Sequence, residues 1–371
     1  MGKKLPRAAR GKPRLTIDVG PLFETQWTGI PVFTRRVVQS MLQRDDVAVD
    51  FCWNLARIDS KAVEAALRIN SGGLLRDWYE RQSGNGLELV DKAGPVFYPS
   101  VKQFHGLVAR EASTVHDIST LVMPENHEAA NVDFHLEHFA EELASSETVF
   151  CVSGATEAAL QANFPSTKSK TRLLYQYVDW PDEFEEIEKN LAPPVIGPYV
   201  VVIGTIEPRK NLALILKALS EPAIRDSAIK FVIVGKKGWK VDSFLAELPP
   251  ASRERLLFTG FVTEFTKYRL LRHCEFMIFP SLYEGFGIPA LEAMSLGKPV
   301  LASMTTSFPE VIGEGGIYFD AYSSAEFSLA FQEMSDATRR LELSRKAVAH
   351  AATFNAKRLS DSLVRWLVEQ H

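Results

Sequence analysis

The chain has 371 residues, of which 46% are hydrophobic and 24% are charged. That length exceeds the roughly 100 to 200 residues of an ordinary domain, and the composition is that of a globular protein, so two packed domains are expected. A net charge of −4, from 42 basic and 46 acidic side chains, argues against a broad surface for nucleic acid. No apolar run approaches the roughly 18 to 20 residues that cross a bilayer and no signal peptide is indicated, which predicts a cytoplasmic chain.

The N-terminal segment, residues 1–14, carries basic side chains and no acidic one. A solvated tail is the simpler interpretation of such a charge block. The alternative is a peripheral contact with anionic lipid on the inner face of the plasma membrane, where each basic residue near the surface contributes about 1 kcal/mol.

Neither a disulfide framework nor a metal cluster is indicated. Cys52, Cys151 and Cys274 are odd in number and widely spaced, so they are expected to be reduced core residues. His135 and His138 together supply too few ligands for a zinc site and are interpreted as helix-surface or core residues.

The first half of the chain alternates segments of strand and helix character. Leu15–Val19 predicts the first strand, and a loop that contains Gly29 leads into a helix over Val32–Leu42. Further strands are expected at Val47–Trp53, Val96–Pro99, Ser113–Val115 and Thr148–Val152, and helices at Asn131–Ala144 and after Ser153. This alternation is typical of a parallel sheet covered by helices.

The pattern is interrupted and then restarts in the second half. An acidic stretch over 182–188 is followed by prolines and a glycine over 193–198, which is typical of a linker between domains. Strands are then expected at Tyr199–Ile203, Lys230–Val234, Leu256–Phe258, Phe276–Phe279 and Pro299–Ala302, and helices at Leu212–Leu219, Glu264–His273, Pro289–Ser295 and over 337–371 with a break near Phe354. The predicted fold class is α/β, with two doubly wound domains facing each other across a cleft. Ligands of such sheets bind beyond the carboxyl ends of the strands.

The first candidate site directly follows the strand that ends at Ile203. Residues 204–211 read GTIEPRKN. The guanidinium fork of Arg209 and the ammonium group of Lys210 can together bind a diphosphate. An Arg-Lys pair at a helix start is, taken alone, more often a solvated surface.

The second candidate site follows the strand that ends at Phe279, where residues 280–292 read PSLYEGFGIPALE. The glycines let the backbone approach a ligand, and the free N–H groups of the helix start that follows favour a phosphate. Glu284 and Glu292 would lie roughly 12 Å apart if the segment were helical throughout. That span suits a sugar nucleotide, with one carboxylate accepting from sugar hydroxyls and the other from ribose hydroxyls.

The same segment also matches the dinucleotide signature G-x-G-x-x-A over 285–290. A dinucleotide site requires this turn after the first strand of a domain, with an acidic residue at the end of the next strand. The next expected strand, Pro299–Ala302, is followed by Ser303, so binding of NAD is not predicted.

The two segments together resemble a known enzyme family. The spacing of Glu284 and Glu292 resembles the E-x7-E signature of the family 4 retaining glycosyltransferases, and the segment Glu-Pro-Arg-Lys-Asn resembles that family's diphosphate-binding loop. The resemblance extends through the second half of the chain. In the first half it rests on Val115-His116-Asp117-Ile118, which is similar to a His-Asp loop facing the cleft. Within the family, the chain most resembles bacterial mannosyltransferase-like enzymes of surface-polysaccharide assembly.

The resemblance implies a GT-B fold and a division of labour between its two domains. Residues 1–192 would bind the acceptor, and residues 193–354 would bind the nucleotide-sugar donor. A C-terminal helix over about 355–371 would return to the first domain.

The resemblance also implies a role for each site residue. Arg209 and Lys210 would bind the donor diphosphate, Glu284 would hold the transferred sugar, and Glu292 would bind the ribose. His116 would reach the donor sugar or its phosphate from the opposite wall. The remaining candidates are the backbone of Gly285, Phe286, Gly287 and Ile288, which would meet sugar and phosphate oxygens, and Gly29, which would line the acceptor side of the cleft.

The implied activity is metal-independent transfer of a hexose with retention of its anomeric configuration. Mannose from GDP-mannose is favoured as the donor, and a glycan or lipid-linked saccharide of an O-antigen, capsule or exopolysaccharide as the acceptor. No cofactor is expected besides the nucleotide sugar, because no Asp-x-Asp motif is present to bridge a metal. Thr205 stands where many members carry Arg, so Arg209 and Lys210 must supply most of the positive charge. The alternatives are a UDP- or dTDP-sugar donor, an inactive relative that binds a nucleotide sugar, and an epimerase.

Overall fold

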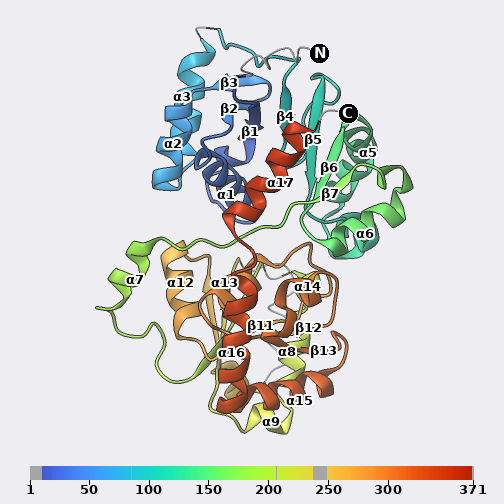
Figure 1. The fold of residues 1–371 in the computed structure, drawn as a ribbon. Coiled ribbons are helices and arrows are strands. Elements are labelled where there is room, and N and C mark those ends of the chain that lie inside the picture. The colour runs from blue at the N-terminus through green and yellow to red at the C-terminus, as the bar shows by residue number, and fades with distance from the viewer. Residues whose placement is uncertain (1–10, 85, 206, 237–248, 370–371) are drawn as a thin grey trace, which may run out of the picture.

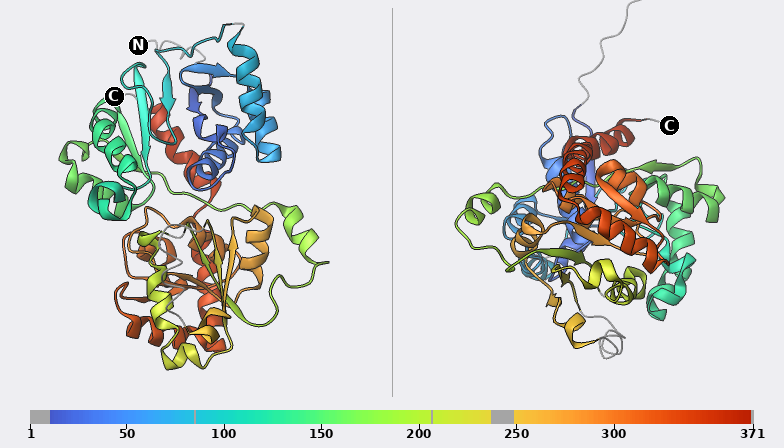
Figure 2. Two further views of the ribbon diagram at one scale, coloured as in Figure 1. Left: turned by 180° about the vertical axis from the view of Figure 1, so that it is seen from behind. Right: turned by 90° about the horizontal axis from the view of Figure 1, so that it is seen from below.

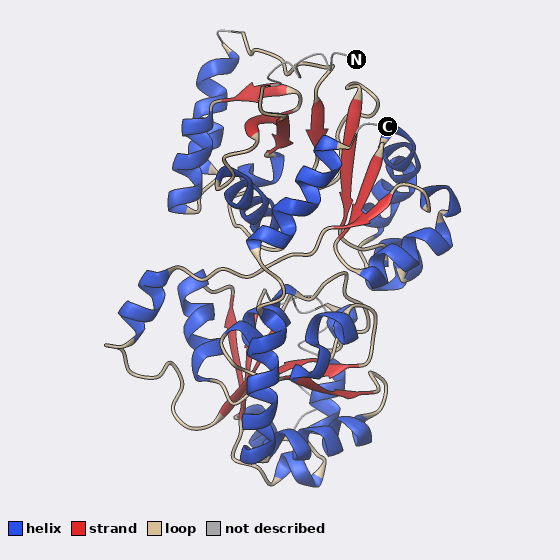
Figure 3. Ribbon diagram, viewed as in Figure 1, coloured by secondary structure: helices blue, strands red, loops and turns tan. Residues whose placement is uncertain are grey.

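The protein consists of two α/β lobes. The computed structural model describes residues 11–84, 86–205, 207–236 and 249–369. The first lobe holds a seven-stranded sheet and the second lobe a six-stranded sheet (Figures 1 and 3). Within these described residues, no helix combines the length and the apolar character that crossing a bilayer requires.

The first lobe is built on a mainly parallel sheet. Its strands are β1 (Arg14–Asp18), β2 (Ala48–Trp53), β3 (Ala56–Ile58), β4 (Pro95–Phe97), β5 (Arg110–Val115), β6 (Thr148–Cys151) and β7 (Thr171–Leu173). Their order across the sheet is β3-β2-β1-β4-β5-β6-β7, and β3 pairs antiparallel with β2 as the second arm of a hairpin. The strand order therefore reverses between β1 and β4. In α/β sheets, ligands bind beyond the carboxyl ends of the strands at such a reversal.

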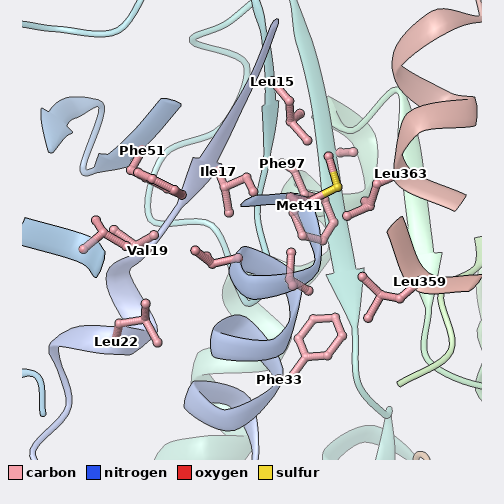
Figure 4. Packing of buried hydrophobic residues seen from close by; sticks show 14 of the residues in the cluster. Leu15, Ile17, Val19, Leu22, Phe33, Met41, Phe51, Phe97, Leu359 and Leu363 are labelled. Carbon is pink, nitrogen blue, oxygen red and sulfur yellow. The ribbon is translucent and has the colours of Figure 1, made fainter. Parts of the chain in front are cut away.

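Apolar side chains at helical spacing fasten the first helix to this sheet. The helices of the lobe are α1 (Ile30–Leu42), α2 (Ser60–Ile69), α3 (Gly73–Ser83), α4 (Ser119–Val122), α5 (Ala129–Ser145) and α6 (Gly154–Asn163). Phe33, Val37 and Met41 recur every four residues along α1, so they share one face of the helix. All three are fully buried in one cluster with Ile17 of β1 and Phe97 of β4 (Figure 4).

The last helix of the chain, α17 (Ala356–Val368), packs on the first lobe although it follows the second. Leu359 and Leu363 lie one turn apart on α17 and join the same cluster as Phe33 and Met41 (Figure 4). Two views of the ribbon show α17 against the first lobe (Figures 1 and 2). The side chain of Asn355 accepts from the Arg358 N–H and begins the helix, which is where the sequence predicted a break.

The second lobe repeats the architecture with six parallel strands. These are β8 (Tyr199–Ile203), β9 (Lys230–Val234), β10 (Leu256–Gly260), β11 (Met277–Phe279), β12 (Val300–Ser303) and β13 (Gly316–Phe319). The order β10-β9-β8-β11-β12-β13 reverses between β8 and β11. The first motif follows β8 and the second follows β11. Because these two strands are neighbours, their carboxyl ends place the two motifs side by side.

The helices of the second lobe surround this sheet. They are α8 (Leu212–Ala218), α9 (Pro222–Arg225), α11 (Pro250–Arg253), α12 (Glu264–His273), α13 (Ile288–Ser295), α14 (Phe308–Ile312), α15 (Ser324–Ser335) and α16 (Ala337–Ala351). The acidic stretch predicted to be a linker forms a helix, α7 (Asp182–Glu188), whose last residue has cationic partners on α12. Glu188 accepts from Arg269 at 2.5 Å and contacts His273 at 2.6 Å, both on α12.

The structure also adds elements that the sequence pattern did not predict. Among them are α2, α3 and the short strands β3, β7 and β13. The expectation for the cysteines is confirmed, since Cys52, Cys151 and Cys274 are buried with free thiols.

Candidate active site

The first motif forms a compact turn at the carboxyl end of β8. Its Arg209 donates from Nη1 to the Tyr283 carbonyl at 2.7 Å, and the Leu282 N–H donates back to the Arg209 carbonyl at 2.8 Å. The side-chain amide of Asn211 donates to the carbonyls of Pro280 at 3.1 Å and Ala321 at 2.8 Å. The two motifs are therefore joined by hydrogen bonds and form one site.

The second motif is a loop over 280–287 that leads into α13. Gly287 precedes the helix with φ at 98°, a left-handed conformation that favours glycine. Ser307 holds the loop, because its hydroxyl donates to the carbonyls of Glu284 at 3.1 Å and Phe286 at 2.9 Å. The helix begins only at Ile288, so the segment from Glu284 to Glu292 is not helical throughout. The expected separation of about 12 Å between these two residues assumed a continuous helix, and that assumption is wrong.

The cations of the first motif and the carboxylate of the second meet as an ion cluster. Lys210 Nζ lies 2.5 Å from Glu284 Oε1, and Arg209 Nη1 lies 3.6 Å from Glu284 Oε2. Arg209 also pairs with Glu207 at 2.8 Å. Burial disfavours the charged form of Arg209, but Glu284, Asp117 and Glu207 outweigh it and raise its pKa. Both basic side chains are therefore already paired with carboxylates.

The space beside Lys210 is small. A hollow of about 10 Å³ between the ends of β8 and β11 is lined by Lys210, Thr205 and Ser281. That volume is close to the room that one water molecule needs. An anion larger than water would therefore reach Lys210 only by displacing Glu284.

The side chain of Phe286 lies in a buried aromatic cluster. Its ring is buried, and it packs against the rings of Tyr175 and Phe354 with centroids 6.5 and 5.6 Å away. The side chain of Phe286 thus has a packing role.

Glu292 lies between the lobes with 1% of its side chain exposed. Lys267 Nζ of α12 is 2.6 Å from its Oε1, and Arg36 Nη2 of α1 is 3.5 Å from the same oxygen. The guanidinium of Arg36 is buried without a hydrogen-bond partner among the described residues, and so is Glu292 Oε2. Sequence reasoning did not predict that cations surround this carboxylate.

His116 belongs to the first lobe and lies on the loop after β5. Its Nε2 is 2.8 Å from the Pro99 carbonyl. Because a carbonyl oxygen only accepts, Nε2 carries the proton and Nδ1 is left as an acceptor. Burial lowers the pKa of His116 despite the nearby Asp117, so the ring is neutral near pH 7. Its ring edge packs against Phe33, with the ring centroids 4.9 Å apart.

The His116 loop meets the second motif directly. A Cβ added to Gly285 would lie 1.8 Å from the His116 carbonyl oxygen, so only glycine permits this approach. The Gly285 carbonyl accepts from the hydroxyls of Ser153 at 2.5 Å and Thr156 at 3.1 Å, both at the start of α6. The structure thus brings His116 to the loop that carries Glu284, from the opposite lobe.

Two more pairs join the lobes and were missed at the sequence level. Arg35 of α1 donates to both carboxylate oxygens of Glu264, at 2.8 and 2.9 Å. Glu310 of α14 accepts from the Gly154 N–H at 2.8 Å. Local sequence patterns do not predict such partners. The one available signal was the position of Glu310, an acidic residue in the first turn of a helix.

Gly29 precedes α1 with φ at 52°. A Cβ added there would meet no atom within 4 Å, so the residue borders open space. None of the contacts described above involves Gly29, and its role in lining an acceptor site stays a prediction.

The comparisons with known proteins agree with this geometry. Residues 183–352, which hold both motifs, match the family described as glycosyl transferases group 1. The sequence is 30% identical to the O-antigen chain mannosyltransferase B of Escherichia coli over 271 residues, which make up 71% of this chain and 70% of that protein. The chain belongs to the group 1 glycosyltransferases. The structural comparisons extend this result to the fold of the whole molecule.

This glycosyltransferase has the GT-B fold that the resemblance implied. It is similar to the sucrose-phosphate synthase of Thermosynechococcus elongatus, with a TM-score of 0.68, 15% identity, and coverage of 95% of this chain and 98% of that one. WaaG, a glycosyltransferase involved in lipopolysaccharide biosynthesis, gives a TM-score of 0.64 at 14% identity, with coverage of 96% of this chain and 100% of that one. At these identities the likeness concerns the fold alone.

Proposed function

We propose that this glycosyltransferase transfers mannose from GDP-mannose, with retention of configuration and without a metal ion, to a glycan or lipid-linked saccharide of a cell-surface polysaccharide. The observation that carries the proposal is the convergence of Arg209, Lys210 and Glu284 on one loop that His116 approaches from the other lobe. The choice of mannose is supported by the similarity to the E. coli O-antigen mannosyltransferase.

The charges of the site suit departure of a nucleoside diphosphate. Cleavage of the sugar–phosphate bond leaves negative charge on the leaving group, and fixed positive charge there lowers the barrier. Arg209 and Lys210 supply two such charges, and the positive end of the α13 dipole adds to them. The cations do the work that a bridging metal does elsewhere, which is our reason for proposing metal independence.

Glu284 takes two partners in turn in this mechanism. Without donor it neutralises Lys210 and Arg209. When the diphosphate binds, the phosphate oxygens replace the carboxylate at these cations, and Glu284 accepts from hydroxyls of the sugar. The departing phosphate then takes the proton of the acceptor hydroxyl on the face from which the acceptor attacks, and the configuration is retained.

Donor identity is tested by thermal unfolding with GDP-mannose, UDP-glucose, UDP-N-acetylglucosamine and dTDP-glucose. A ligand at 100 times its Kd stabilises the folded state by about 2.7 kcal/mol, so GDP-mannose should raise the melting temperature by several degrees and the others by less. Equal shifts with a UDP or dTDP sugar would replace the donor assignment. Binding without transfer to any saccharide would favour an inactive relative, and conversion of the free donor without acceptor would favour an epimerase.

His116→Ala should slow turnover while leaving donor affinity near that of the wild type. The reason is that His116 lies on the first lobe, whereas the cations that hold the diphosphate belong to the second. The Kd from donor titration and kcat from single-turnover transfer separate the two effects. The control is His138→Ala, which removes a half-exposed ring from α5. Unchanged turnover in His116→Ala would assign that ring to packing against Phe33.

The proposed contact with anionic membrane is independent of the donor site. It rests on the basic block over 1–14, of which residues 1–10 lie outside the described residues. Peripheral binding at the inner face of the plasma membrane would bring the enzyme to a lipid-linked acceptor, and it remains a proposal.

A further inference from the structure

A second pocket lies in the first lobe, away from the ion cluster. It has a volume of about 280 Å³, close to the lower end of ligand-binding cavities at about 300 Å³. Its lining includes Asp18, Trp53 and Tyr98, which stand at or next to the carboxyl ends of β1, β2 and β4. The strand order of the first sheet reverses between β1 and β4. The pocket therefore occupies the position at which α/β sheets bind ligands.

The pocket adjoins the His116 loop. Tyr98 and Ser100 both line it, and the residue between them, Pro99, accepts from His116 through its carbonyl. Because the His116 loop also touches Gly285, a ligand in the pocket would lie on the acceptor side of the proposed reaction.

Trp53 provides an aromatic surface that is held in place. Its ring stacks on Phe23, with centroids 4.1 Å apart, and meets the edge of Tyr79 at 4.5 Å. The turn after it, Asn54-Leu55, has φ of 51° and 62°, as a two-residue hairpin requires. Leucine is strained in this conformation, and such strain is typical of ligand sites. A fixed, half-buried aromatic face suits the apolar C–H face of a pyranose ring.

The polar groups of the pocket are hydrogen-bonding and acidic, and none of the described residues that line it is Lys or Arg. Asp18 Oδ1 accepts from the Gly20 N–H at 2.9 Å, and Oδ2 has the Cys52 thiol at 3.9 Å. Burial raises the pKa of Asp18 to about 7, so near neutral pH this carboxyl both donates and accepts. Glu24 adds an exposed carboxylate. Such a lining repels phosphate and matches sugar hydroxyls.

We propose that this pocket binds one neutral hexopyranose unit of the acceptor, with its ring on Trp53 and its hydroxyls on Asp18 and Glu24. The inference rests on the proposed function only in calling the bound sugar the acceptor. The binding itself follows from the lining of the pocket. The proposal names a neutral sugar because the exposed Glu24 carboxylate disfavours an anionic group, such as the pyrophosphate of a lipid carrier.

Saturation-transfer NMR with mannobiose as the probe tests the proposal on the full chain. The wild type should transfer saturation to one pyranose ring, and Trp53→Ala should weaken binding about tenfold or more. Glu24→Gln, an isosteric change at an exposed position that folding tolerates, should weaken binding severalfold. The matched controls are Tyr322→Ala, whose ring is 78% exposed on the second lobe, and Asp226→Asn, an exposed carboxylate there. Both controls should bind mannobiose as the wild type does.

The outcomes separate the pocket from the donor site. If GDP-mannose binds and the Trp53 and Glu24 variants bind mannobiose as tightly as the wild type, the pocket assignment is wrong and the proposed function stands. If no nucleotide sugar binds but mannobiose still binds in a Trp53-dependent way, the pocket stands and the donor proposal fails. Absence of saturation transfer from the wild type at tens of millimolar mannobiose, or displacement of mannobiose by inorganic pyrophosphate, would also overturn the pocket assignment.

Discussion

Lys210→Ala is expected to lower the rate of transfer by about 100-fold or more, which corresponds to roughly 2.7 kcal/mol of lost transition-state stabilisation. The ammonium group of Lys210 lies 2.5 Å from Glu284, and in the proposed mechanism it binds the diphosphate in place of that carboxylate. Glu284→Ala should cause a loss of similar size, because the transferred sugar then loses its carboxylate. The ratio of kcat/KM between variant and wild type measures both losses.

The two substitutions also test the exchange of partners at Glu284. With Glu284 removed, Lys210 is free before donor arrives, so GDP should bind at least as tightly to Glu284→Ala as to the wild type. Lys210→Ala should bind GDP more weakly. The matched control is Lys189→Ala, which breaks a 2.7 Å pair with Glu186 on the surface of α7 and should leave transfer unchanged. Near-normal transfer by either site variant would remove that residue from the catalytic assignment.

Gly285→Ala is expected to abolish most transfer by a purely steric route. The new methyl group would lie 1.8 Å from the carbonyl oxygen of His116 and 2.9 Å from the Cβ of Asp117, both in the opposite lobe. Real Cβ atoms do not approach other atoms so closely, so the two lobes must move apart at this point. Since a misplacement of about 1 Å can cost about 100-fold in rate, a loss of this order or larger is expected.

Donor binding and folding separate this effect from simple destabilisation. The cations proposed to hold the diphosphate, Arg209 and Lys210, lie in the second lobe, so Gly285→Ala should retain the thermal shift with GDP while transfer falls. Gly84→Ala is the control, because a Cβ at that position meets no atom within 4 Å and its φ of −71° suits alanine. Transfer within a few-fold of the wild-type rate would show that the contact between the His116 and Gly285 loops is dispensable.

For Glu292, the partner that the resemblance implies differs from the partners that the structure shows. The resemblance assigns this carboxylate to the ribose, whereas in the structure it is enclosed by Lys267 and Arg36. Ribose binding thus requires Glu292 to exchange one of these cations for hydroxyl groups. Because Arg36 belongs to the first lobe, such an exchange would couple donor binding to the contact between the lobes.

Much of the second lobe could be predicted because its signals are local. Fully apolar runs such as Tyr199–Ile203 form strands covered on both faces, and residue spacing within Glu264–His273 specifies a helix whose bounds the structure reproduces. The loops after β8 and β11 could be recognised because glycine, proline and paired charges at the end of a strand or the start of a helix indicate a turn that can approach a ligand.

Contacts between distant residues left no such local signal. Nothing near Arg36 in the sequence indicates Glu292, and nothing near Gly285 indicates the His116 carbonyl, because these partners are fixed by how the lobes pack. The pocket at Asp18 and Trp53 was missed for the same reason, since β1, β2 and β4 supply its lining from separate parts of the chain.

The sequence by itself determined the α/β class, the strands that carry the two motifs and the charged residues within those motifs, since these depend on periodicity and residue type over short spans. The tertiary structure alone decided which strands are neighbours, which lobe faces Gly285, and which carboxyls are buried. Burial also governs the pKa of Asp18, because desolvation depends on every atom packed around the group and not on its neighbours in the chain.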